Sequence, residues 1–108
     1  MPQFLYVIEP ARRGFLAAPN AGEAEAVELH FQYLRTLTER GIVLLAGRTE
    51  GETDDTFGIV LFVAGSEREA QSTMLRDPAV EAGVFRARLY PFRAALGSLA
   101  VQDLRPRD

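Results

Sequence analysis

Cysteine and lysine are absent from this chain of 108 residues, and histidine occurs once. Without cysteine, the chain has no disulfides, no thiolate metal ligands and no cysteine nucleophile. A single histidine cannot build a histidine-rich metal cluster within one chain, and we expect neither a metal nor a cofactor. With arginine as the only strongly basic residue and a formal net charge of -3, no broad basic surface is expected, and we predict no nucleic-acid partner.

Long apolar runs are also missing. No segment approaches the roughly 18 consecutive apolar residues that a membrane span requires, and the first nine residues lack the basic region and apolar run of a signal peptide. We therefore expect a cytoplasmic protein with no membrane partner. A chain of this length forms one domain, which we place at residues 1–96, followed by a loosely held polar tail at 97–108.

The elements predicted by apolar periodicity and turn residues follow the order βαββαβ. This order is typical of the ferredoxin-like α+β fold, a four-stranded antiparallel sheet with two helices on one face. A turn is expected at 78–83. The predicted strands are 4–8, 42–47, 57–63 and 84–92, and the predicted helices are 22–40 and 67–76.

Both faces of the first three predicted strands are apolar. In the first strand, Phe4, Tyr6 and Ile8 point one way, and Leu5 and Val7 point the other way. An antiparallel sheet with one face in water normally alternates apolar and polar residues, and the two helices cover only one face. We therefore expect a homodimer in which two sheets pack face to face.

His30 is the first candidate site residue. Asn20 is a suitable N-cap and Gly41 a suitable stop for the helix predicted over 22–40. At about 100° per residue, His30 lies near the edge of the apolar stripe of this helix and should face the protein interior. The other members of that stripe are Ala24, Val27, Phe31, Leu34 and Leu37.

Asp77 is the second candidate. It closes the second predicted helix before Pro78, and its spacing from Ala70 and Met74 places it on the inward face. A carboxylate at a helix C-terminus opposes the helix dipole, so a nearby cation or hydrogen-bond donor is expected. The imidazole of His30 is a suitable donor.

Several segments, in this order and spacing, resemble the YCII-related family over residues 4–92. They are the histidine-bearing segment 30–34, the glycine-flanked apolar segment 41–47, Asp77-Pro78 followed by Gly83, and a last strand that ends in Pro91-Phe92. The resemblance implies a ferredoxin-like fold assembled as a dimeric α+β barrel. It also implies an acid/base pair at His30 and Asp77 and a small, often aromatic-derived substrate.

Two functions remain open at this level. A histidine held by a carboxylate suits a general acid or base at neutral pH. Because no serine or cysteine is placed as a nucleophile, proton transfer, elimination or isomerisation of a small organic compound is favoured over acyl transfer. The alternative is a non-catalytic ligand-binding or interaction domain, in which His30 is a buried histidine satisfied by Asp77.

Further residues are candidates for substrate binding. Arg86 and Arg88 share one face of the last strand, where guanidinium groups could bind a carboxylate or act as solvated residues of an edge strand. Tyr6 and Tyr33 could line a pocket near His30 or pack in the core. The loop 49–56 carries four carboxylates without the spacing of a calcium loop, so a solvated hairpin is expected there. Arg12 and Arg13 are expected in a surface loop that could gate a cleft.

Overall fold

The computed structural model describes residues 1–97, and the tail predicted at 97–108 therefore lies almost wholly outside the described residues. The elements match the predicted order, with one short helix added. They are β1 (Gln3–Pro10), α1 (Ala21–Glu39), β2 (Val43–Arg48), β3 (Gly58–Val63), α2 (Glu67–Leu75), α3 (Pro78–Glu81) and β4 (Phe85–Phe92).

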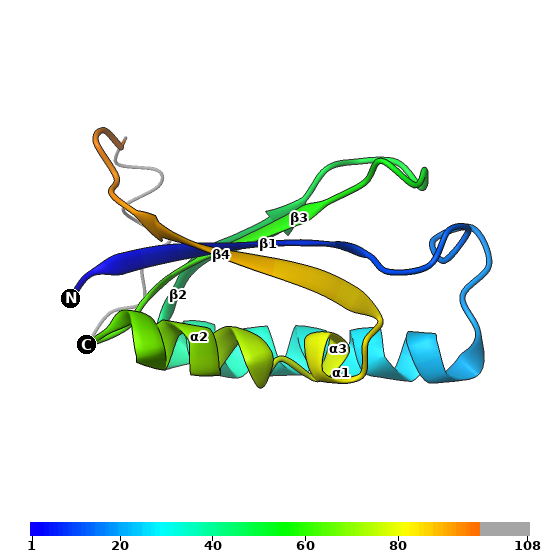
Figure 1. Cartoon of the computed structure of the whole chain (residues 1–108), viewed down its shortest axis with the longest axis horizontal. Helices are drawn as coiled ribbons and strands as arrows, with labels where there is room; N and C mark the ends of the chain where they lie inside the picture. The colour runs from blue at the N-terminus through cyan, green and yellow to red at the C-terminus, as the bar shows by residue number, and fades with distance from the viewer. Residues whose placement is uncertain (98–108) are drawn as a thin grey trace.

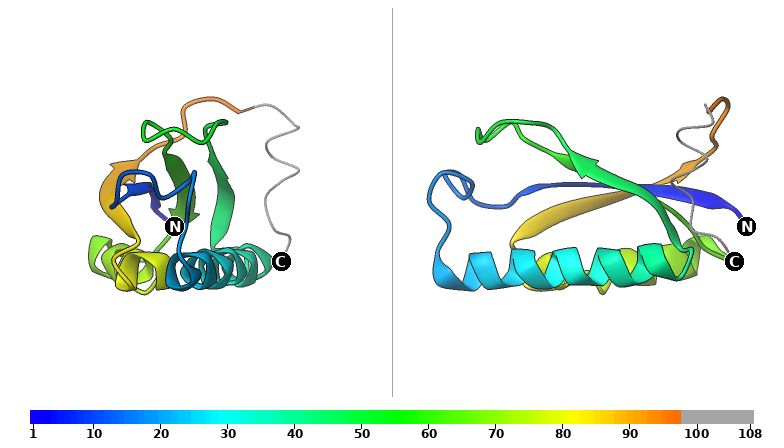
Figure 2. Two further views of the ribbon diagram at one scale, coloured as in Figure 1. Left: turned by 90° about the vertical axis from the view of Figure 1, so that its right-hand side faces the viewer. Right: turned by 180° about the vertical axis from the view of Figure 1, so that it is seen from behind.

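The four strands form one antiparallel sheet in the order β2-β3-β1-β4. All helices lie in a single layer on one face of this sheet (Figures 1 and 2). This arrangement is the ferredoxin-like α+β fold, and it confirms the predicted fold class. Within residues 1–97, no helix is both long and apolar enough to cross a membrane.

Helix α1 begins and ends where its capping residues predict. The Asn20 side chain accepts a hydrogen bond from the backbone N–H of Glu23, and the Glu23 carboxylate accepts one from the backbone N–H of Asn20. This reciprocal capping box satisfies two N–H groups that a helix start leaves free. At the other end, Gly41 has a φ of 81°, a left-handed conformation that costs glycine little.

The core lies between the sheet and the helix layer. Along β1, Phe4, Tyr6 and Ile8 are buried against the helices, whereas the residues between them are half-buried on the other face. Leu34 and Leu37 of α1 pack against this row. Alternation along a strand therefore places the Tyr6 side chain directly under the helices, where it becomes part of the site described below.

The inward face of α1 differs from the predicted stripe. Ala24 is exposed and Phe31 is 55% exposed, while Ala26 is buried. The buried face therefore lies to one side of the predicted stripe, and His30 lies near its middle instead of at its edge. The predicted stripe was displaced because it included every apolar residue, and Phe31, though apolar, lies at the rim of a cavity.

The segment after α2 is a short helix, not the predicted turn. Asp77 is the N-cap of α3, and its side chain accepts a hydrogen bond from the backbone N–H of Ala79, with Pro78 at the first helical position. Asp77 therefore follows the C-cap of α2, as predicted, and also begins α3, which was not predicted. The carboxylate lies at the start of a helix, where its negative charge is stabilised.

The face of the sheet away from the helices carries a cross-strand apolar row. The strand registers place Leu45, Leu61, Leu5 and Tyr90 beside one another across all four strands. Leu45 and Tyr90 are exposed, and the other two are half-buried. In the described residues, no helix covers this row, because every helix lies on the opposite face (Figure 2).

Candidate active site

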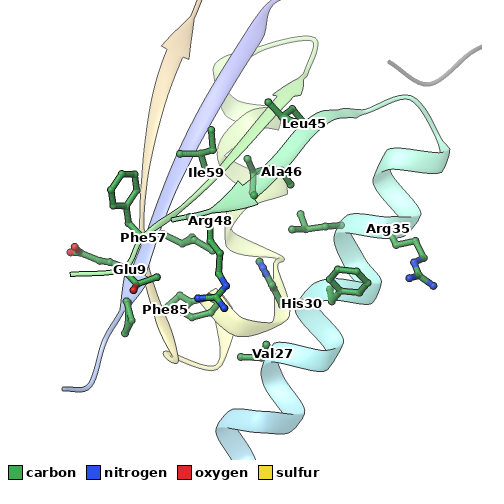
Figure 3. Close-up of a pocket in the computed structure, with 18 of the residues that line it drawn as sticks. Glu9, Val27, His30, Arg35, Leu45, Ala46, Arg48, Phe57, Ile59 and Phe85 are labelled. Carbon is green, nitrogen blue, oxygen red and sulfur yellow. The ribbon is translucent and has the colours of Figure 1, made fainter. Parts of the chain in front are cut away.

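A cavity of about 720 Å³ lies between α1 and the end of the sheet where the β2–β3 hairpin rises away from the helices (Figures 1 and 3). Its volume falls within the usual range for small-molecule sites. Its walls are mainly apolar, with a few charged groups. Residues that shape it include Val27, His30, Arg48, Phe57, Ile59 and Phe85.

His30 and Asp77 are in direct contact at this cavity. His30 Nδ1 lies 2.8 Å from Oδ1 and 2.7 Å from Oδ2 of Asp77. The Asp77 side chain is fully buried, whereas the His30 side chain is 12% exposed and lines the cavity. The two residues are 47 positions apart in sequence, and the packing of α1 beside α3 brings them together.

Three donors form hydrogen bonds with the Asp77 carboxylate: His30, the Tyr6 hydroxyl and the backbone N–H of Ala79. Tyr6 donates its hydroxyl to Oδ2 at 2.8 Å, and the backbone N–H of Ala79 donates to Oδ1 at 3.0 Å. Burial, with the negative charge of Asp77 beside it, raises the pKa of the Tyr6 hydroxyl well above its ordinary value, so Tyr6 remains a donor. These contacts, together with His30, compensate a carboxylate that has no access to water.

The plane of the His30 ring is also constrained. Phe85 at the start of β4 meets it edge to face, with ring centroids 5.3 Å apart and an angle of 80° between the planes. Phe15, from the loop after β1, meets Phe85 in the same way at 5.8 Å. With Nδ1 directed at Asp77, the second ring nitrogen, Nε2, has no hydrogen-bond partner within residues 1–97.

Arg48 is a charged cavity residue that the sequence analysis did not single out. It lies at the end of β2, and its guanidinium points into the cavity (Figure 3). A β-bulge between Val43 and Leu45 shifts the strand register, so that Arg48 pairs with Gly58 on the inward face. An uninterrupted alternation from Val43 would have turned Arg48 outward. The sequence offers only one signal, a charged residue that ends an apolar strand.

Two of the predicted substrate-binding residues, Tyr33 and Arg86, have other partners, and a third, Arg88, lies on the outer face of the sheet. Tyr33 donates its hydroxyl to the backbone carbonyl of Thr73 at 2.7 Å, which links α1 to α2. Arg86 is exposed and lies 3.5 Å from Glu9. Arg88, like Arg86, points away from the helices on the outer face of the sheet.

Tyr6, the fourth predicted residue, contacts Asp77 beneath the cavity wall and is fully buried. The four residues do not line the cavity described here.

Comparison with known proteins identifies the family. The YCII-related domain matches residues 5–93, which is most of the chain. The chain belongs to the YCII-related family. No curated protein sequence matches it.

Solved structures also match this YCII-related chain. One is 5-chloro-2-hydroxyhydroquinone dehydrochlorinase from Burkholderia phenoliruptrix AC1100, in complex with 2,5-dihydroxybenzoquinone. It is 22% identical in sequence, has a TM-score of 0.62, and the match covers 83% of this chain and 93% of that chain. At this level of identity, the likeness establishes a shared fold.

Two loops meet at the open end of the YCII-related domain. Arg12 binds both carboxylate oxygens of Glu23, at 2.9 and 2.7 Å. Asp54, from the β2–β3 hairpin, accepts a hydrogen bond from the backbone N–H of Gly14 at 2.8 Å and lies 3.6 Å from Arg13. The loop after β1 is therefore tied to both α1 and the hairpin, and its Phe15 forms part of the cavity wall.

The acidic residues of the hairpin loop do not gather around a common point. Asp54 binds the loop after β1, as described above. Across the part of the chain that the structure describes, no group of three or more histidine or acidic side chains is placed to hold a metal ion. The polar chemistry of the cavity therefore comes from His30 and Arg48 and from the charged side chains at its rim.

Proposed function

We propose that this YCII-related protein is an enzyme that uses His30 as a general acid and base on a small organic compound bound in the cavity. One observation carries the proposal: His30 bridges a fully buried carboxylate and the cavity. A histidine needed only for the fold would gain nothing from an unpaired Nε2 beside a cavity of ligand size.

The contact with Asp77 sets the chemistry of the ring. Because the carboxylate accepts a hydrogen bond from Nδ1–H, Nε2 carries the lone pair and can take a proton from a bound substrate. The imidazolium that results is stabilised by the same carboxylate. Nε2 then returns the proton to another atom of the substrate, or to water after a leaving group has departed. This sequence supports proton transfer, elimination or isomerisation.

The cavity favours a compact, ring-sized substrate. Its walls include the aromatic rings of Phe57 and Phe85, and its volume of about 720 Å³ suits a small molecule. The structural neighbour, named a dehydrochlorinase and bound to a dihydroxybenzoquinone, agrees with such a substrate. In an elimination of this kind, Nε2 would remove a proton, a double bond would form and chloride would leave.

Deuterium exchange tests the proposal without knowledge of the natural reaction. The protein is incubated in deuterated buffer with 5-chloro-2-hydroxyhydroquinone and with a set of small hydroxylated aromatic acids. Chloride release and loss of the carbon-bound proton signals are followed by electrode and proton NMR. We expect catalysed exchange or chloride release for at least one compound, and its loss in His30→Ala.

The rival function, a non-catalytic ligand-binding domain, predicts a different outcome. Compounds would bind, but neither exchange nor chloride release would exceed the rate without protein. Exchange that proceeds equally in wild type and in folded His30→Ala would also contradict the proposed role of His30.

We further propose that the protein is a homodimer joined through the outer face of its sheet. The support is the apolar row Leu45, Leu61, Leu5 and Tyr90, which the helices leave uncovered. Light scattering should give about twice the chain mass of 11.9 kDa. Leu61→Glu, which places a charge at the centre of the row, should give the monomer mass. A wild-type monomer at micromolar concentration would contradict the dimer.

A further inference from the structure

We infer that Arg48 is an anion-recognition residue that selects, as substrates for this cavity, planar ring compounds that carry an acidic oxygen, such as a carboxylate or an ionised enol. The inference rests on the proposed function, because it names the substrate class of the same cavity. It assigns binding to β2 and chemistry to α1, two elements that face each other across the space (Figure 3).

The guanidinium of Arg48 is held in place but keeps most of its donors. Its Nη1 donates to the backbone carbonyl of Gly51 at 3.0 Å, which uses one of five N–H groups. The hydroxyl of buried Thr56 is 3.3 Å from the same carbonyl oxygen. Gly51 has a φ of 107°, which disfavours other residues at this position. The remaining donors of Arg48 can bind an oxyanion with two parallel hydrogen bonds.

Within residues 1–97, Arg48 has no carboxylate partner. Glu9, also at the cavity, lies 3.5 Å from Arg86. Glu39 lies nine residues after His30, roughly 13 Å further along α1 at 1.5 Å per residue. A guanidinium beside an apolar cavity and without an acidic partner is suited to an anionic ligand.

The other arginine at the cavity is placed differently. The guanidinium carbon of Arg35 lies 5.1 Å from the centre of the Phe31 ring, a cation–π contact on the surface of α1. Figure 3 shows Arg35 directed away from the cavity, whereas Arg48 is directed into it. Of the two arginines, Arg48 is therefore the one placed to contact a ligand.

The apolar walls strengthen this recognition and orient the ligand. Phe85 packs against the ring of His30, and Phe57 and Ile59 line the cavity just before and at the start of β3. An ion pair that excludes water is stronger than one in bulk solvent, because less of it is screened. A ring between these side chains, with its oxyanion at Arg48, would present its far edge to Nε2 of His30. Arg48 is therefore expected to determine specificity, while His30 carries the proton.

Binding of benzoate and benzamide tests the inference, because the two compounds share a ring and differ in charge. Affinities are measured on the whole chain by calorimetry or NMR titration. We expect wild type to bind benzoate at least tenfold more tightly than benzamide. Arg48→Gln should weaken benzoate binding roughly tenfold to a hundredfold and leave benzamide unchanged, which corresponds to loss of a charge-assisted hydrogen bond. The benzoate affinity of Arg48→Lys should lie between those of wild type and Arg48→Gln.

Controls separate this inference from the proposed function. Arg68→Gln removes the same charge at an exposed position of α2 that does not line the cavity. This variant should bind benzoate as tightly as wild type. Titration with 2,5-dihydroxybenzoquinone then distinguishes an enolate from a carboxylate as the preferred anion. Loss of turnover in His30→Ala is measured separately, so that acid/base catalysis can fail while anion binding stands, or the reverse.

Three results would overturn the role of Arg48. The first is equal affinity of wild type for benzoate and benzamide. The second is unchanged benzoate affinity in folded Arg48→Gln. The third is the absence of saturable binding of both benzoate and 2,5-dihydroxybenzoquinone at millimolar concentration.

Discussion

The two charged sides of the cavity are built in opposite ways. On the α1 side, His30 is fixed by Asp77, which is fully buried and bound to Tyr6 and to the backbone of Ala79. On the hairpin side, Arg48 is exposed and bound to a single loop carbonyl. The first arrangement is continuous with the hydrophobic core, and the second depends on a surface loop.

In the proposed function, this difference separates proton transfer, at His30 and Asp77, from ligand recognition, at Arg48. The contact between His30 and Asp77 is held by the same interactions that hold the fold, so substitutions there are expected to affect stability as well as activity. The proposed anion contact lies where substitutions cost the fold little. The comparison implies that variation around Arg48 would alter the substrate without altering the acid/base pair.

The largest expected effect is on turnover at the α1 side. His30→Ala should lower the rate with any identified substrate by roughly 10² to 10⁴, the usual contribution of a general acid or base. Asp77→Asn should lose somewhat less, because the imidazole survives without its oriented tautomer. The double variant should be little worse than His30→Ala, since the two act as one unit. Steady-state kinetics measure all three.

Gln32→Ala, at an exposed position of the same helix, is the control for this series and should leave the rate unchanged. Additive losses in the double variant would show that the two residues act independently.

The next largest effect is a difference in the free energy of unfolding between variants at Asp77 and variants at Arg48. Asp77→Ala should lower the free energy of unfolding by about 2 to 4 kcal/mol, because it leaves the buried Tyr6 hydroxyl and the Ala79 N–H without an acceptor. Asp77→Asn should lose less, since the amide oxygen remains an acceptor. Arg48→Gln should change stability by less than about 0.5 kcal/mol, as expected of an exposed side chain. Urea denaturation measures each value.

Asp55→Ala, an exposed acidic residue in the hairpin loop, is the matched control for loss of a carboxylate. If Arg48→Gln destabilised the protein as much as Asp77→Ala, the contrast between the two sides would be wrong.

A smaller effect on turnover should distinguish Tyr6 from Tyr33, whose hydroxyl groups each donate one hydrogen bond. Tyr6→Phe removes a donor to Asp77, and Tyr33→Phe removes a donor to the backbone of Thr73. Each should cost about 1 kcal/mol of stability. Only Tyr6→Phe should also lower turnover, because it removes a hydrogen bond that holds the Asp77 carboxylate against His30. Equal kinetics in the two variants would place Tyr6 outside the site.

The smallest effect concerns the loop after β1. Hydrogen bonding to Arg12, with a second bond from the backbone of Asn20, lowers the pKa of Glu23 from its ordinary value of 4.5 to about 2. Because the folded-state pKa is the lower one, this contribution to stability is fully present above pH 4.5 and is lost as the pH falls towards 2. The contribution is small, since Arg12 is about half exposed and solvent screens the pair.

An NMR titration of the Glu23 side chain measures this pKa. In Arg12→Gln the titration midpoint should move up towards 4.5, and the signals of Phe15 should report any accompanying change in the cavity wall. A midpoint that is the same in both proteins would show that Arg12 does not hold the carboxylate.

The element order, the limits of α1 and the fold class followed from local signals. Asn20, Glu23 and Gly41 act through neighbouring backbone groups, and such contacts can be read from adjacent residues. Helix periodicity singled out His30 and Asp77, the resemblance to the YCII-related family implied a role for both, and the structure places them in contact. Their catalytic role, the dimer and the substrate remain predictions.

What only the tertiary structure decided depends on contacts between distant segments. The β-bulge after Val43 turned Arg48 into the cavity, and a shift of one residue reverses the face of every later side chain in a strand. Asp77 proved to be the N-cap of α3, and the buried Tyr6 proved to be its third donor. Sequence alone determined the four strands and the two longer helices, because capping and periodicity are local, but it did not reveal α3. The placement of Tyr6 and Arg48 beside His30 and Asp77 was decided by register and packing, which no local pattern encodes.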